Sequence, residues 1–289
     1  MLLSTFIKSS VKALKPLYPE LEARSMVHLL CQERLGVMSW THIVEPGREV
    51  PPEQLPMLQE DVARMSAGEP IQYVIGYTEF YGRVFNTDKR ALIPRIETEM
   101  LVSEAVNMAR SLPFEQEGLR VLDLCTGSGC VAWSLAYELP GAAVTASDIS
   151  TDALDLAKGQ FRRLPNKVLR PNFVQGDILD FSTPFPRCEL LTANPPYITE
   201  PERALMRPNV LDWEPEIALF APESDPLAFH KAIALWAMRL LSPSGGGVVE
   251  INEDLGVESA EVFRKAGLED VRIVRDFAEK ERFISFRRP

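Results

Sequence analysis

The stretch with the most specific chemistry is Asn194-Pro195-Pro196-Tyr197, which suits a planar N–H₂ group. Adjacent prolines cannot continue a central strand, because neither donates a ladder hydrogen bond, so they form a rigid turn. The Asn194 side-chain oxygen and the Pro195 carbonyl can each accept one N–H, and Tyr197 can pack on the flat face of the acceptor group. Two such acceptors orient a poorly nucleophilic nitrogen and favour the positive charge that develops on it. All four residues are therefore catalytic candidates, and no general base is required.

A glycine-rich loop lies upstream, at Asp123-Leu124-Cys125-Thr126-Gly127-Ser128-Gly129-Cys130. Gly127 and Gly129 allow a tight turn and the close approach of a ligand to the backbone. Asp148 follows the next apolar run, where a carboxylate can accept two hydrogen bonds from a ribose diol. Asp177 follows the run after that, where it can meet an adenine amino group. Together these residues indicate a cofactor that contains adenosine.

The glycine loop leaves two cofactor classes open. Gly127–Ala132 also fits the G-x-G-x-x-A fingerprint of dinucleotide-binding proteins, with Asp148 at about the right distance. A pyrophosphate at a helix N-terminus needs N–H donors and positive potential, and the Asp123 carboxylate would repel it. S-adenosylmethionine has no phosphate and carries an ammonium near its sulfonium. Asp123 therefore favours a methyltransferase over a nicotinamide-dependent dehydrogenase, which stays open as the alternative.

These residues must be positioned by a sheet whose strand ends lie close together. Helical spacing at Val131–Glu138 and Thr151–Leu164 alternates with short apolar runs, which predicts an α/β fold with a parallel sheet covered by helices on both faces. Ligands bind outside the carboxyl ends of the strands in such sheets. The predicted strands are Arg120–Leu124, Ala143–Ser147, Asn172–Gln175, Leu190–Ala193, Gly247–Glu250, Val271–Arg275 and Phe283–Phe286.

Residues 1–68 have a different pattern and predict a small helical domain. Apolar residues recur at helical spacing within Leu21–Leu35 and again within Pro56–Met65. The domain has no catalytic signature of its own. It serves either as a packing module or as a module that docks a partner.

A β-hairpin is predicted between the two domains. Ile71–Gly76 and Phe80–Phe85 are rich in β-branched and aromatic residues and are punctuated by glycines. We therefore expect a hairpin linker over residues 69–93 and the α/β domain over residues 94–289.

The composition excludes several classes of partner. A charge of −10 argues against a protein that grips duplex DNA by its phosphates. Four cysteines without a C-x-x-C pair, and only three histidines, predict free thiols and no metal site. No apolar run approaches the roughly 20 residues that span a bilayer, and the N-terminus lacks the pattern of a secretory signal. We expect a cytoplasmic protein that does not bind membranes.

The acceptor motif suits adenine N6, cytosine N4 or a glutamine amide. Enzymes that modify bases in duplex DNA must extract the base while holding the duplex. The chain has no long basic insertion and no separate DNA-reading domain. A glutamine on a protein partner is therefore favoured, and a nucleobase amino group remains an alternative.

Nearly the whole chain resembles the peptide chain release factor glutamine N5-methyltransferase family. Besides the glycine loop and the Asn-Pro-Pro-Tyr motif, the resemblance is carried by Glu69–Tyr73 with Gly76, Phe80–Gly82, Leu92–Glu99, Asp148–Ser150 and Glu214-Pro215. It implies a seven-stranded Rossmann-like class I methyltransferase domain that uses S-adenosylmethionine. It also implies methylation of the glutamine in the Gly-Gly-Gln motif of class 1 release factors, with the helical N-terminal domain engaging the release factor. Related enzymes include one that acts on a ribosomal-protein glutamine, but Pro-Arg-x-Glu-Thr-Glu favours the release-factor branch. We expect a monomer.

The resemblance also implies two sets of site residues. Glu97 and Glu99 have a second interpretation, as acids that favour a helix N-terminus. The implied cofactor-binding residues are Asp123, Thr126, Gly127, Ser128, Gly129, Cys130, Asp148, Ile149, Asp177, Ile178 and Asn194. The implied substrate-binding residues are Pro94, Arg95, Glu97, Glu99, Asn194, Pro195 and Tyr197.

The chain departs from the family pattern at four places. Ile96 stands where the family has proline, and Cys125 where a glycine is common. Residues 221–226 replace a glycine-rich stretch, and residues 251–253 replace an Ile-Gly-aromatic pattern. The last two departures concern the rim of the site after the fourth strand.

Overall fold

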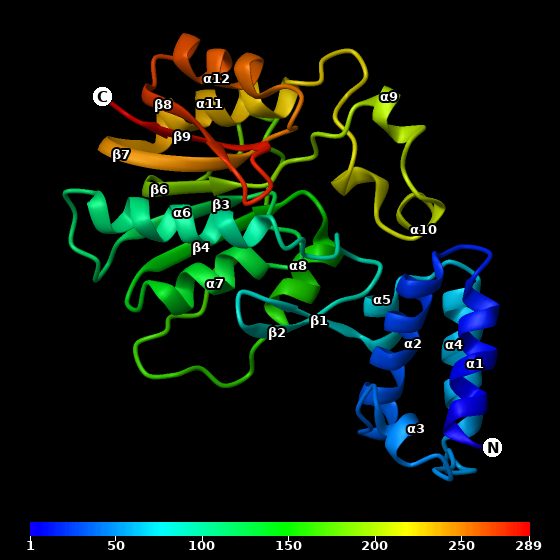
Figure 1. Ribbon diagram of the computed structural model, residues 1–289. Helices are drawn as coiled ribbons and strands as arrows, with labels where there is room; N and C mark the ends of the chain where they lie inside the picture. The colour runs from blue at the N-terminus through cyan, green and yellow to red at the C-terminus, as the bar shows by residue number, and fades with distance from the viewer. The chain divides into compact units, whose positions relative to one another are not determined.

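A computed structural model describes residues 1–289, which divide into two compact units (Figure 1). The first unit comprises Met1–Tyr77 together with Arg207–Trp213, and the second comprises Thr78–Met206 and Glu214–Pro289. The short segment Arg207–Trp213 thus belongs to the helical unit although it follows the acceptor motif in sequence. No helix is both long and apolar enough to cross a lipid bilayer.

The first unit is built from helices, with one isolated β-bridge between Leu2 and Glu49. Helices α1, α2 and α4 pack against one another around a core that includes Leu14, Leu30, Leu58 and Met65. Helix α2 ends at Gly36, whose φ of 65° closes the helix in the left-handed conformation. The helices of this unit are α1 (Leu3–Leu14), α2 (Glu20–Leu35), α3 (Thr41–Val44), α4 (Leu55–Ser66), α5 (Ile71–Ile75) and α10 (Pro208–Leu211).

The strand predicted over Ile71–Gly76 is wrong, because these residues form helix α5 and its cap. Gly76 has a φ of 89° and ends the helix, and the helical turn buries Ile71 and Val74 in the first unit's core. Hydrophobic periodicity in a segment this short does not distinguish a strand from a helix. The helix is favoured here because it buries the apolar side chains in the core of the first unit.

The hairpin itself exists, but it begins later than predicted. It consists of β1 (Tyr77–Phe80) and β2 (Arg83–Asn86). Tyr81 and Gly82 between them both have positive φ, at 50° and 68°. This is the backbone of a type I′ turn, whose twist matches the twist of the two strands.

The second unit contains the seven-stranded sheet, in the order β5-β4-β3-β6-β7-β9-β8. The first five of these strands are parallel, and β9 runs antiparallel to both β7 and β8. This confirms the predicted α/β class. The strands are β3 (Arg120–Leu124), β4 (Ala143–Asp148), β5 (Asn172–Gln175), β6 (Cys188–Ala193), β7 (Leu241–Glu250), β8 (Glu269–Arg275) and β9 (Glu281–Arg287).

Helices connect these strands. One predicted helix is shorter than expected, because α8 ends at Lys158 and not at Leu164. Glycine follows at position 159, and the Gln160 side chain bonds to the backbone of Asn86 and Ser128, which the continued helix would not allow. The helices of this unit are α6 (Thr98–Ser111), α7 (Cys130–Glu138), α8 (Thr151–Lys158), α9 (Glu200–Arg203), the 3₁₀ helix Glu216–Ala218, α11 (Ala228–Leu240) and α12 (Gly256–Lys265).

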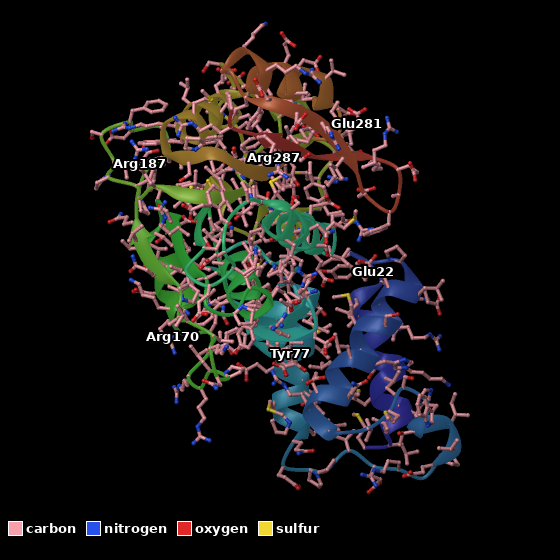
Figure 2. All side chains as sticks on the ribbon, turned by 90° about the vertical axis from the view of Figure 1, so that its left-hand side faces the viewer. Glu22, Tyr77, Arg170, Arg187, Glu281 and Arg287 are labelled. Atoms are coloured by element: carbon pink, nitrogen blue, oxygen red, sulfur yellow. The ribbon has the colours of Figure 1, made fainter.

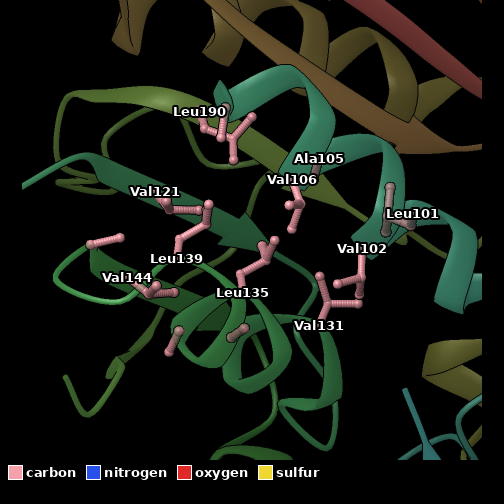
Figure 3. Packing of buried hydrophobic residues seen from close by; sticks show 14 of the residues in the cluster. Leu101, Val102, Ala105, Val106, Val121, Val131, Leu135, Leu139, Val144 and Leu190 are labelled. Atoms are coloured by element: carbon pink, nitrogen blue, oxygen red, sulfur yellow. The ribbon is translucent and has the colours of Figure 1, made fainter. Parts of the chain in front are cut away.

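Successive side chains along each strand point to opposite faces of the sheet, so a hydrophobic core lies on each face. Val121 and Leu190 point to one face, where α6 and α7 pack on them through residues such as Val106 and Leu135 (Figure 3). The intervening residues Leu122 and Leu191, and their neighbours, face α11 and α12 on the other side. Figure 2 shows charged side chains such as Arg170 and Arg187 at the surface of this unit. Both faces of the sheet are therefore covered, as expected for parallel strands.

The strand order reverses between β3 and β6. From β3 the chain moves outward to β4 and β5, then returns to place β6 on the other side of β3. The carboxyl ends of β3 and β6 diverge at this point, which is where open α/β sheets bind ligands. The glycine loop follows β3, and the acceptor motif follows β6.

Candidate active site

A cavity of about 240 Å³ opens at the carboxyl ends of β3, β4, β5 and β6. It is the meeting place of most of the residues singled out in the sequence. The predicted residues that line it are Pro94, Arg95, Asp123, Thr126, Gly127, Ser128, Cys130, Asp148, Ile149, Asp177, Ile178, Asn194 and Pro196.

Three residues of the glycine loop have positive φ, and two of them, Cys125 and Gly127, line the cavity. Cys125, Gly127 and Gly129 have φ of 57°, 53° and 79°. Glycine adopts this conformation at little cost, whereas Cys125 adopts it at a cost of about 1–2 kcal/mol. Gly129 does not line the cavity. A Cβ there would lie 2.9 Å from the Ala157 Cβ, so this glycine lets the loop pack closely on α8.

Asp148 ties the glycine loop to the end of β4. Its Oδ2 accepts from the Gly127 backbone N–H at 2.8 Å, and its Oδ1 accepts from Ser150 N–H at 3.0 Å. Burial raises the pKa of the carboxyl above its ordinary value, while these backbone hydrogen bonds oppose the rise. A carboxylate offers about four lone-pair sites, so Asp148 can hold the loop and still accept from a ligand.

Asp123 is the most deeply buried acid of the loop, with 1% of its surface exposed. Its two oxygens accept from the hydroxyls of Thr126 and Thr192, at 2.6 and 2.7 Å. It forms no ion pair, and burial raises its pKa to about 6. A carboxyl held in this way would be stabilised in its ionised form by a cation brought into the cavity.

The part of the cavity lining that follows β5 is mostly apolar. The Asp177 Oδ1 accepts from the Leu179 backbone N–H at 2.8 Å, which shapes the turn. The carbonyl of Ile178 accepts from the indole N–H of Trp236 at 2.8 Å, and this anchors the wall to α11. Ile149 is part of the same cavity lining. Together these residues form a surface on which a flat heterocycle can pack.

The acceptor motif is held by a hydrogen-bonded chain of side chains. The Asn194 Nδ2 lies 3.3 Å from Thr98 Oγ1, and Thr98 Oγ1 donates to Glu250 Oε2 at 2.8 Å. The Tyr197 hydroxyl donates to the other oxygen, Glu250 Oε1, at 3.0 Å. The motif is thus connected to the start of α6 and to the last residue of β7.

Glu250 lies in the interior, with 1% of its surface exposed. Burial raises its pKa to about 7, whereas the hydrogen bonds from Thr98 and Tyr197 oppose the rise. Its carbonyl oxygen lies 3.1 Å from the His230 Nε2, and burial lowers the pKa of His230 to about 4. His230 is therefore neutral near neutral pH and donates to this carbonyl.

One departure from the family pattern has a visible role. Asn252 stands in the 251–253 segment, is buried, and donates through Nδ2 to the Tyr197 carbonyl at 3.2 Å and to Glu202 Oε2 at 2.7 Å. Glu202 also accepts from the Thr199 N–H as part of the capping box that begins α9. Asn252 therefore connects the acceptor motif to the helix that follows it.

Several predicted residues are not brought into the cavity. Pro195 and Tyr197 do not line it, although their neighbours do. Glu97 and Glu99 do not line it either, and Glu99 Oε1 instead accepts from the Tyr81 N–H in the hairpin turn. Arg95 lines the cavity, but its guanidinium is paired with the buried Glu214 at 2.7 Å.

The sequence did not single out Glu250 as a member of the site, and it indicated Thr98 only within the Leu92–Glu99 segment that carries the resemblance. The signal for Glu250 was available, because an acid ends the otherwise apolar run Gly247–Glu250 at the carboxyl end of a predicted strand. Nothing local paired these two residues, which are far apart in sequence.

Comparisons with known proteins agree with this geometry. Residues 7–76 match the family model described as PrmC N-terminal domain, and residues 121–207 match the model described as Methyltransferase domain. The first match covers most of the helical unit, and the second covers the glycine loop and the acceptor motif.

Three relatives share the chain's length, and each is named release factor glutamine methyltransferase. The protein from Bacteroides thetaiotaomicron is 36% identical, over 96% of this chain and 97% of its own length. The protein from Flavobacterium psychrophilum is 32% identical, over 98% of each chain. The protein from Bordetella pertussis is 38% identical, over 92% of this chain and 94% of its own length.

Proposed function

This chain belongs to the release factor glutamine methyltransferase family, and we propose that it methylates the side-chain amide N5 of the glutamine in the Gly-Gly-Gln motif of class 1 peptide chain release factors. The methyl donor is S-adenosylmethionine. The observation that carries the proposal is the Asn194 amide, which lines a cavity shared with the glycine loop and has its nitrogen engaged by Thr98.

The cavity residues fit S-adenosylmethionine. When bound, this cofactor supplies an electrophilic methyl group on a sulfonium. Asp123 is buried without a cation partner and burial raises its pKa to about 6, so a cationic ligand group would stabilise its ionised form. Asp148 has free lone pairs for a ribose diol, and Ile149 and Ile178 offer an apolar wall for adenine. Asp177 lies at the same end of the cavity, within reach of polar groups on the base.

The same residues disfavour a dinucleotide. A pyrophosphate needs unpaired cations or N–H donors in a positive field. Two arginines line the cavity, but Arg90 is paired with Asp88 at 2.7 Å and Arg95 with Glu214. The glycine loop faces two carboxylates instead. The dehydrogenase alternative is therefore not favoured.

The residues after β6 prepare the amide nitrogen for attack. We propose that the Asn194 Oδ1, which lines the cavity, and the carbonyl of the adjacent Pro195 accept the two N–H groups of the glutamine amide. The Pro195 carbonyl forms no backbone hydrogen bond of its own. Two acceptors turn the nitrogen toward the methyl group and stabilise the positive charge that forms as its conjugation is lost. The proton then leaves to solvent after transfer, so no base is needed in the cavity.

Tyr197 supports this arrangement from outside the cavity. Its hydroxyl is held by Glu250 and its carbonyl by Asn252. We propose that the ring contacts the glutamine once the release factor is bound. Pro94 and Arg95 line the cavity, and we propose that they contact the residues next to the glutamine.

We further propose that the first unit docks the release factor, and that the enzyme acts as a monomer in the cytoplasm. The docking role is supported by the separate compact core of the helical unit, which contains none of the cavity residues. The charge of −10 supports a protein partner over duplex DNA.

The test is transfer of labelled methyl from S-adenosylmethionine to a purified, unmodified class 1 release factor. A release factor with Gly-Gly-Gln changed to Gly-Gly-Ala is the matched control. We expect label on the normal factor alone. Label on neither factor, with cofactor binding intact, would reject the acceptor, whereas no cofactor binding would reject the reaction class.

A further inference from the structure

The side-chain amide of Asn194 can lie in two orientations that differ only in the positions of its oxygen and nitrogen. One orientation places Oδ1 where it can accept from a substrate N–H, and the other places Nδ2 there. Only the first supports the chemistry of the proposed function, on which this inference rests. Some group must therefore favour it, and the hydrogen bonds around Asn194 identify that group.

The orientation follows from donors and acceptors. An ionised carboxylate only accepts hydrogen bonds, so the single hydroxyl proton of Thr98 is committed to Glu250 Oε2, at 2.8 Å. The Thr98 oxygen then has only lone pairs to offer to Asn194. The nearer atom of the amide must be Nδ2, which lies 3.3 Å away. Reversing the amide would place two acceptors against each other.

We propose that Glu250 is a positioning residue for methyl transfer, which acts through Thr98 to hold the Asn194 amide with its oxygen toward the substrate. Asn194 touches the substrate, whereas Thr98 and Glu250 act by setting its orientation.

Glu250 is suited to this role because its own position is fixed. It is the last residue of β7 and pairs with Phe283 of β9, and its carbonyl accepts from His230. Its second carboxylate oxygen accepts from the Tyr197 hydroxyl. Both oxygens therefore have a donor, and a single carboxylate sets the side chains at both ends of the Asn-Pro-Pro-Tyr turn.

Glu250→Gln and Thr98→Val test this role in two ways. The glutamine can donate to Thr98 through its amide, which frees the threonine proton for Asn194 and removes the preference for the productive orientation. The valine keeps the shape of threonine and removes the hydroxyl. We expect either change to lower kcat by about 10- to 100-fold, as losses of supporting hydrogen bonds to reacting groups do. KM for the release factor and the calorimetric affinity for S-adenosylmethionine should stay within about twofold.

The controls separate positioning from general damage. Thr98→Ser keeps the hydroxyl and should retain most of the kcat. Thr87→Val changes a buried threonine whose hydroxyl has no partner. Glu189→Gln changes a buried glutamate at the opposite end of β6, which is paired with Arg120. Neither of these two should lower kcat. The double variant of Glu250→Gln with Thr98→Val should lose no more kcat than the worse single variant.

The outcomes distinguish this inference from the proposed function. A wild-type kcat in Glu250→Gln or in Thr98→Val, or fully additive losses in the double variant, would overturn the positioning role alone. A loss of kcat accompanied by a clear loss of cofactor affinity and a lower melting temperature would also overturn the positioning role. No label from the wild-type enzyme would overturn both the proposed function and this role.

Discussion

Three acids lie near the carboxyl ends of the strands, the buried Asp123 and Glu250 and the partly buried Asp148, and their hydrogen-bond partners give them different roles. Asp123 accepts only from hydroxyls, Asp148 from two backbone N–H groups, and Glu250 from the Thr98 and Tyr197 hydroxyls. Backbone donors fix Asp148 against the loop and leave its outer lone pairs free. Asp148 is therefore the acid best placed to bind the ribose, and Glu250 the one best placed to orient a side chain.

Replacing Asp148 with alanine should chiefly weaken cofactor binding. The change removes acceptors for a ribose diol and releases the Gly127 N–H, so we expect a loss of about 10- to 100-fold in the affinity for S-adenosylmethionine. Isothermal titration calorimetry measures this directly, with the exposed Asp180→Ala as control. Unchanged affinity would remove Asp148 from the ribose site.

The kcat should rise with pH near neutrality, whereas the free energy of unfolding should fall. The carboxyl of Glu250 has a pKa raised from 4.5 to about 7, mainly by burial, in surroundings that include Tyr197, Arg282, Glu97 and the neutral His230. Only its ionised form accepts from both hydroxyls, so kcat should rise with pH through about 7. Glu250→Gln should lack this inflection, and a wild-type kcat that is flat from pH 6 to 8 would contradict the assignment.

The sign for stability follows from proton binding. Between pH 4.5 and about 7 the folded state holds a proton on Glu250 that the unfolded state has lost. The free energy of unfolding should therefore fall as pH rises through this window, by at most about 1.4 kcal/mol per pH unit for one group. Asp123, with a pKa raised from 3.8 to about 6, acts in the same direction. Urea unfolding at several pH values measures this change. The free energy of unfolding should fall less steeply with pH for Glu250→Gln than for the wild type.

At the scale of elements, the loop between β3 and α7 combines two different requirements for glycine. Gly127 has a φ of 53° and open space where a Cβ would lie, whereas Gly129 has a φ of 79° and close neighbours on three sides. A Cβ on Gly129 would lie 2.9 Å from Ala157 and 3.2 Å from Trp133. The first glycine serves the approach of a ligand, and the second serves packing.

The two alanine substitutions should therefore differ in kind. Gly129→Ala combines backbone strain with overpacking and should cost about 2–4 kcal/mol of unfolding free energy. Gly127→Ala should cost about 1–2 kcal/mol and act mainly on cofactor affinity. Thermal unfolding and calorimetry on both variants measure the difference. Equal losses of stability would mean that the packing around Gly129 relaxes more readily than the contacts indicate.

The elements also show what sequence patterns could predict. Runs such as Arg120–Leu124 and Leu190–Ala193 are short, apolar and separated by helical spacing, and each is a strand in the sheet. Ile71–Gly76 is also short and mainly apolar, yet it forms a helix, because the helical turn buries Ile71 and Val74 in the core of the helical unit.

The glycine loop and the Asn-Pro-Pro-Tyr motif were predictable because their chemistry lies in consecutive residues. The hydrogen bond between Thr98 and Glu250 was not predictable, since the two residues are 152 positions apart and meet only where α6 begins beside the end of β7. The pairing of Arg95 with Glu214, 119 positions away, was hidden for the same reason. Contacts of this kind depend on the folded sheet and leave no local pattern.

At the scale of the whole molecule, the first unit carries an exposed apolar segment. Trp40, Ile43 and Val44 around α3 are each more than half exposed, with Met38 beside them. Single exposed apolar residues are ordinary, whereas contiguous exposed apolar patches often form contacts with other molecules. If the first unit docks the release factor, as we propose, this segment is the part of it best suited to an apolar contact with a protein.

Changing both Trp40 and Ile43 to serine should raise KM for the intact release factor by about 5- to 20-fold, because exposed aromatic anchors account for much of the binding energy at protein interfaces. The kcat and the affinity for S-adenosylmethionine should not change, since neither residue belongs to the cavity. A short peptide that contains Gly-Gly-Gln should be methylated with the same KM by both enzymes, because a peptide cannot reach a separate docking surface. Val257→Ser, an exposed apolar residue on α12, is the control. An unchanged KM for the intact factor would exclude the α3 segment from docking, and an equal rise for the peptide would show that the substitutions disturb the cavity instead.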